Sequence, residues 1–107
     1  MTSLELQRTL VKSPPELWGE LSDVARLARL LDDGFEDLRI VRATPERLVH
    51  WRASGASGLI ELEPAGWGTK VKLTAELEAA VTPVGARAAL ERLLDEAGSA
   101  HHRPFSR

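Results

Sequence analysis

The hydrophobic pattern between Leu38 and Leu77 constrains the fold more than any other feature of this chain. Apolar residues alternate with polar ones there, and turn signals recur about every ten residues, in "ATPE", "ASGASG" and "PAGWG". Alternation with a period of two indicates strands with one buried face, and short turns between such strands indicate antiparallel hairpins. The segment therefore predicts a meander of four antiparallel strands.

The register of this meander follows from its apolar positions, because directly opposed residues in an antiparallel pair point to the same side of the sheet. The expected partners are Ile60 with Leu73, Trp51 with Ile60, and Ile40 with Val49. Each connecting loop then contains an even number of residues. One face of the sheet is entirely apolar, and it carries Leu38, Ile40, Val49, Trp51, Ile60, Leu62, Val71, Leu73, Ala75 and Leu77.

The opposite face of the meander is charged. Glu61 is expected to face Lys72, and His50 is expected beside Glu61 and Arg39. Opposite charges across strands stabilise a sheet weakly and are typical of a solvated surface. A histidine beside a carboxylate can act as a base or a metal ligand, but no second ligand stands at a useful spacing. We therefore interpret His50 as part of a surface pair.

The segment before the meander predicts a strand and two short helices. "LELQRTLV" at residues 4–11 alternates like a strand, and Arg8 lies on its apolar face. "SPPE" then reads as a helix start, in which Ser13 caps, the prolines occupy the first turn and the glutamate completes a capping box. A second start near residue 22 leads into "VARLARLLDD", whose leucines repeat at helical spacing.

The segment after the meander predicts one longer helix, which begins at Thr82 and Pro83 and ends at Gly98. Its apolar stripe comprises Ala86, Leu90, Leu93, Leu94 and Ala97. A single apolar sheet face and a single apolar helix stripe bury each other. The sequence therefore predicts one α+β domain over residues 1–98, in which a curved antiparallel sheet of about five strands grips a C-terminal helix. Residues 99–107 are expected to form a loose polar tail.

This order of elements resembles the START-like superfamily, also called the polyketide cyclase/dehydrase, SRPBCC or Bet v 1-like helix-grip proteins. "LQRTLVKSPPELWGELSDVARL" is similar to that family's first strand and its two short helices. "VHWRASG", "GLIELEP" and "GTKVKLTAELE" are similar to its middle strands. Two strands of the usual meander are missing, so the resemblance is to a shortened member. It implies a hydrophobic pocket between sheet and helix that takes a lipid, a polyketide or a quinone.

The composition narrows the possible partners. The 107 residues carry a formal net charge of -2 and include no cysteine. Such a charge gives no long-range attraction for nucleic acid or anionic lipid, and we find neither a signal-peptide pattern nor an apolar stretch that could span a bilayer. We expect a cytoplasmic protein with no metal or other cofactor, no nucleic-acid partner and no membrane insertion.

The resemblance places candidate ligand-binding residues on the inner face of the sheet and on the last helix. The expected lining comprises Leu38, Trp51, Ile60, Leu73, Leu90 and Leu94. Arg8 would join it by pairing with an anionic group of a ligand, or else extend to solvent at the end of its strand. Trp51 would stack on a planar ligand, or else serve as an ordinary core residue.

Two other functions stay open. If the shortened sheet encloses no pocket, the protein is an interaction module that acts as a homodimer through an exposed sheet edge and Trp67, a large apolar residue at a hairpin tip. A cyclase-like or hydrolytic enzyme is disfavoured, because the inner face of the meander offers no acid or base. His101 and His102 have no acidic or sulfur ligand nearby and are interpreted as part of a solvated tail.

Overall fold

The structure, a computed structural model, describes residues 2–31, 34–66, 68–79 and 81–98. The expected order of elements is confirmed. They are β1 (Thr2–Leu10), α1 (Pro14–Leu21), α2 (Val24–Leu30), β2 (Arg39–Thr44), β3 (Leu48–Ala53), β4 (Ala56–Ala65), β5 (Gly68–Leu77) and α3 (Pro83–Ala97). No helix in these ranges is long and apolar enough to cross a membrane.

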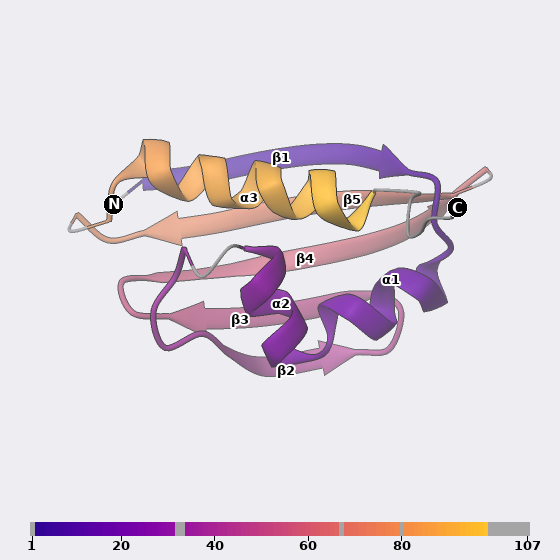
Figure 1. Cartoon of the computed structure of the whole chain (residues 1–107), viewed down its shortest axis with the longest axis horizontal. Coiled ribbons are helices and arrows are strands. Elements are labelled where there is room, and N and C mark those ends of the chain that lie inside the picture. Colours follow the sequence, from indigo (N-terminus) through magenta and orange to yellow (C-terminus); the bar gives the residue numbers. More distant parts are fainter. Residues whose placement is uncertain (1, 32–33, 67, 80, 99–107) are drawn as a thin grey trace, which may run out of the picture.

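The five strands form one curved antiparallel sheet with the order β1-β5-β4-β3-β2. All three helices lie on the same face of this sheet (Figure 1). The C-terminal helix α3 runs along β1 and β5, whereas α1 and α2 cover the half that contains β3 and β4 (Figure 1). The α+β class and the gripping of the C-terminal helix are therefore confirmed.

The core lies between the sheet and the helices. Along most of β4 and β5, residues with buried side chains alternate with half-buried or exposed ones, as the period of two predicts. Helix α3 contributes six buried residues at helical spacing, which are Ala86, Ala89, Leu90, Leu93, Leu94 and Ala97. Leu17 and Leu21 of α1 and Leu27 of α2 complete the same hydrophobic cluster. One core therefore joins both halves of the helical layer.

Helix α1 begins as its sequence predicts. The Ser13 side chain accepts a bond from the Glu16 backbone N–H, and the Glu16 carboxylate accepts one from the Ser13 backbone N–H at 3.1 Å. Asp23 caps α2 by accepting from the backbone of Ala25 at 2.9 Å. Thr82 stands at the N-cap of α3 with Pro83 after it, but its side chain makes no capping bond. The proline and the buried stripe therefore determine where α3 begins.

The register of the last hairpin is confirmed, and those of the other two hairpins were wrong. Ile60 pairs with Leu73. Trp51, however, pairs with Gly58 instead of Ile60. The turn between β3 and β4 occupies Ser54 and Gly55, and Gly55 has a φ of 74°, which glycine adopts without strain. The pairing is displaced by two positions, so every side chain keeps its face.

The first hairpin differs because β2 contains a bulge. Ile40 pairs with Trp51 instead of Val49, and the register then shifts between Ile40 and Arg42. Thr44 pairs with Leu48, which leaves a loop at positions 45–47 and not the expected even number. A β-bulge inserts one unpaired residue and bends its strand. Alternation in the sequence does not reveal such an insertion.

Candidate functional site

The side chains that were expected to line a pocket form the packed core. Trp51, Ile60, Leu73, Leu90 and Leu94 are each 1% exposed and belong to one continuous cluster, against which Leu38 packs half-buried. The structure therefore brings the expected residues together, with their apolar surfaces in contact with one another. Their role in binding a ligand stays a prediction.

Trp51 has two neighbours that the sequence pattern did not indicate. The ring of Phe35 lies 5.0 Å from the indole, centroid to centroid, and the two planes are inclined by 52°. Gly58 lies opposite on β4 and leaves room for the indole. Phe35 precedes the meander in a segment without periodicity, so only the folded chain shows that it reaches the core.

Arg8 lies at the edge of the sheet and reaches out of the interior. Its register partner is Val71, so its side chain starts on the helix-covered face. The guanidinium Nη1 atom donates to the Asp95 Oδ1 atom of α3 at 2.5 Å, and the Arg8 side chain is 41% exposed. The ion pair ties β1 to α3 at the surface. Of the two roles considered for Arg8, extension toward solvent agrees with this placement.

A hollow of about 860 Å³ lies where β4 runs past the end of β3. Leu48 pairs with Glu61, the Leu62 N–H donates to the Arg47 carbonyl at 2.8 Å, and beyond this point β4 has no partner in β3. Pro14 and the turn between β2 and β3 complete the rim.

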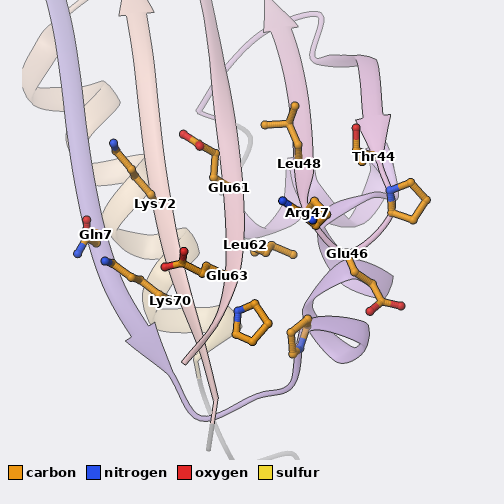
Figure 2. Close-up of a pocket in the computed structure, with 13 residues that line it drawn as sticks. Gln7, Thr44, Glu46, Arg47, Leu48, Glu61, Leu62, Glu63, Lys70 and Lys72 are labelled. Carbon is orange, nitrogen blue, oxygen red and sulfur yellow. The ribbon is translucent and has the colours of Figure 1, made fainter. Parts of the chain in front are cut away.

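Charged side chains from neighbouring strands line the outer side of this first hollow (Figure 2). Glu61 pairs with Lys72 and Glu63 pairs with Lys70 across β4 and β5, as expected from the sequence. Lys72 also forms an ion pair with Glu5 of β1 at 3.3 Å. The opposite charges neutralise one another, and the described residues contain no group of three or more metal-ligating side chains.

A second hollow, of about 620 Å³, lies among α1, α2 and α3. Its lining contains both acidic and basic side chains, which are Glu16 and Glu20 from α1, Arg26 and Arg29 from α2, and Arg92 and Glu96 from α3. Hydrogen bonds from the backbone and the side chain of Ser13 lower the pKa of Glu16 from its ordinary value of 4.5. Glu20 accepts a bond from Lys12 at 3.1 Å. The Glu16 carboxylate therefore carries charge at neutral pH.

A group of basic side chains occupies the outer face at the β2 edge of the sheet. Arg39 pairs with Arg52, and Arg42 pairs with His50. On its other side His50 pairs with Leu59, so the expected position of His50 beside Glu61 and Arg39 was wrong. The displaced registers cause the difference. We call these four residues the basic corner, and no acidic side chain in the described ranges lies within ion-pair distance of them.

Trp67, His101 and His102 lie outside the described residues. Ala65 pairs with Gly68 at the end of the last hairpin.

Comparison with known proteins finds similar structures but no matching sequence family. No family model matches the chain, and no curated protein matches it. Solved structures do match. Protein CV1439 from Chromobacterium violaceum is 14% identical, with a TM-score of 0.71 over 90% of this chain and 94% of that one.

Two other matching structures carry descriptive names. The Aha1 dimer from Colwellia psychrerythraea is 14% identical, with a TM-score of 0.70 over 94% of this chain and 96% of that one. An AHSA1-like protein from Aeromonas hydrophila is 13% identical, with a TM-score of 0.69 over 95% of this chain and 99% of that one. Such proteins belong to the START-like superfamily. The chain described here therefore has the START-like helix-grip fold.

Proposed function

We propose that the protein is an interaction module that assembles as a homodimer through the free edge of β1. The observation that carries this proposal is the contrast between the two edges of the sheet. Strand β1 pairs with β5 without a break from Thr2 to Leu10, and no strand among the described residues lies along its other edge. A long, regular edge strand presents a row of backbone donors and acceptors that another chain can pair with.

The opposite edge is protected. Strand β2 is six residues long, carries a bulge and places Arg39 and Arg42 on its outer face. Bulges and charged side chains are the usual means by which proteins prevent edge-to-edge pairing. Strand β1 contains neither a bulge in its pairing with β5 nor a proline or lysine. Self-association through the sheet is therefore favoured at β1.

The sequence of β1 suits pairing with a second copy of itself. Directly opposed residues share a face, and full overlap of Thr2–Leu10 about a two-fold axis puts Leu6 at the centre. Glu5 then faces Gln7 of the partner subunit, and no like charges are opposed. A register displaced by two positions, which places Glu5 opposite its own copy, would bring two carboxylates together, which is unfavourable.

Two further findings support this proposal. The interior of the helix-grip fold is filled by the protein's own side chains. In addition, one protein with the same fold, from Colwellia psychrerythraea, has a structure described as a dimer.

Substitutions at Gln7 test the β1 dimer. In the proposed pairing Gln7→Glu creates two like-charge pairs per dimer and Gln7→Lys creates two opposite pairs, each worth about 0.2–1 kcal/mol. The dimer dissociation constant should rise about 2- to 30-fold in the first variant and fall by a similar factor in the second. Size-exclusion chromatography with light scattering over a concentration series measures it.

The same two variants also separate an effect on dimer formation from an effect on the folding of one protomer. Gln7 pairs with Lys72 within one protomer, so Gln7→Glu adds an attraction there and Gln7→Lys a repulsion. Effects on folding should therefore run opposite to effects on assembly. A wild-type chain that is monomeric at all concentrations, or a dimer indifferent to both variants, would contradict the proposal. Dissociation by Trp67→Ala with no response to Gln7→Glu would place the interface at the hairpin tip.

An apolar ligand held between the sheet and α3 is the second candidate function. It is favoured by the largely apolar inner face and by the second hollow, where parting α2 from α3 would open a path to Leu90 and Leu94. Native mass spectrometry of the full chain from its host tests it. A retained small-molecule mass that denaturation releases would support this function, whereas a chain of bare mass would contradict it.

A further inference from the structure

The basic corner has an arrangement that is unfavourable unless something covers it. Arg39 and Arg52 are directly opposed across β2 and β3, and so are Arg42 and His50. Both members of the first pair are exposed. Like charges directly opposite one another destabilise a sheet. The other half of the outer face differs, because there Glu61 and Glu63 pair with Lys72 and Lys70.

The bulge in β2 concentrates this charge. In an unbroken strand Arg39 and Val41 would share a face, and Arg42 would point to the other. The register shift after Ile40 instead pairs Arg42 with His50, next to the pair of Arg39 with Arg52. Val41, the inserted residue, is left 46% exposed. Two arginines on the edge strand therefore project on one side, and two apolar residues, Ile40 and Val41, lie between them in the sequence.

We propose that the basic corner binds an acidic, extended segment of another protein, which adds to the sheet as a strand beside β2. Among the described strands β2 has one neighbour, β3, and the arginines that oppose pairing with a second copy of β2 favour an added strand that carries carboxylates. Carboxylates on alternate residues of the added strand would lie over Arg39 and Arg42 and relieve the repulsion between Arg39 and Arg52. The proposal deepens the function as an interaction module, and it does not depend on the β1 dimer.

The charge distribution selects this partner over two others. A second copy of β2 would bring further arginines against Arg39 and Arg42. The like charges would repel each other, whereas a strand that carries carboxylates would be attracted to the same edge. Nucleic acid is a long polyanion, and the chain as a whole has a formal net charge of -2. A local basic surface on an acidic protein suits a short acidic segment better than an extended phosphate backbone.

A labelled peptide of alternating glutamate and valine tests the proposal, with a lysine–valine peptide as its counterpart. Fluorescence anisotropy should show binding of the acidic peptide only, weakening as salt is raised. The double variant Arg39→Glu with Arg52→Glu should weaken binding about tenfold or more. The matched control reverses Arg26 and Arg29 on α2, which changes the charge equally on the other side of the sheet, and should leave affinity near that of the wild type.

Backbone amide shifts distinguish strand addition from loose ionic contact. On titration with the acidic peptide, the largest NMR shifts should fall on β2. The proposal is overturned if the peptide does not bind, if the α2 control weakens binding equally, if shifts avoid β2, or if duplex DNA of the same charge binds more tightly. Gln7→Glu should bind the peptide as the wild type does, so failure of the dimer and failure of this surface give different results.

Discussion

The Trp51 side chain fits into the core because its cross-strand neighbour, Gly58, has no side chain. The indole lies against Gly58 on β4, and a Cβ atom on Gly58 would come within 2.5 Å of the indole Cζ2 atom and would also overlap the Thr74 carbonyl oxygen. The Phe35 ring closes another side of the indole. Because Trp51 is the largest fully buried side chain among the described residues, the room left by Gly58 determines how the centre of the sheet packs.

Gly58→Ala should therefore destabilise the protein. Overpacking a close-packed core costs about 1–3 kcal/mol, and here both backbone and ring would have to move. Chemical denaturation measures the free energy of unfolding. Gly19→Ala in α1 is the control, because no atom lies within 4 Å of its added Cβ atom. It should raise stability by up to about 1 kcal/mol through helix propensity. Equal stability of Gly58→Ala and wild type would contradict the packing of Trp51.

At the scale of elements, helix α3 is held to the sheet by apolar burial. Leu90, Leu93 and Leu94 are each 1% exposed, whereas the ion pair of Arg8 with Asp95 joins side chains that are 41% and 69% exposed. Exposed ion pairs contribute about 0–1 kcal/mol, since water and salt screen them. Deleting a buried leucine side chain costs about 2–5 kcal/mol, because it loses transfer energy and leaves a cavity.

Two adjacent substitutions in α3 separate these contributions. Leu94→Ala should lower the free energy of unfolding by about 2–5 kcal/mol. Asp95→Asn, the next residue, keeps the shape of the side chain, removes the ion pair and should cost at most about 1 kcal/mol. Denaturation curves of both variants at low and high salt supply the comparison. A cost for Asp95→Asn as large as that for Leu94→Ala would mean that the ion pair, and not the apolar stripe, holds α3.

At the scale of the whole molecule, the described elements between residues 2 and 98 form one core. Helix α3 ends with Ala97, which is fully buried, and Gly98 follows as its C-cap. The sheet buries one face only, and the three helices together cover that face (Figure 1). Loss of the final turns of α3 would expose the sheet, because no other element of the described chain covers β1 and β5.

A chain that ends at residue 98 should therefore unfold like the full chain, with a Tm changed by less than the ~4–8 °C that about 1 kcal/mol produces in a domain of this size. A chain that ends at residue 92 lacks Leu93, Leu94 and Ala97 and should lose cooperative unfolding. Circular dichroism during heating measures both. A large fall in Tm for the chain ending at 98 would show that the remaining residues contribute to the fold.

Much of the fold could be predicted from local patterns. The alternation along β4 and β5 identifies the buried face, because successive side chains in a strand point to opposite sides. It also pairs Ile60 with Leu73. The capping box at Ser13 predicts the start of α1, because those residue types satisfy backbone donors that a helix leaves unpaired. Such features depend on a few neighbouring residues, so they can be predicted from the sequence alone.

The tertiary structure alone decided the rest. A register displaced by two positions preserves every face, so alternation could not distinguish Trp51 opposite Ile60 from Trp51 opposite Gly58. The bulge that brings Arg42 beside His50 depends on how β2 meets β3. Whether the space under α3 is open or filled depends on distances among side chains far apart in the chain. The sequence by itself therefore determined which residues face inward, and tertiary packing decided that they fill the interior and that the basic corner exists.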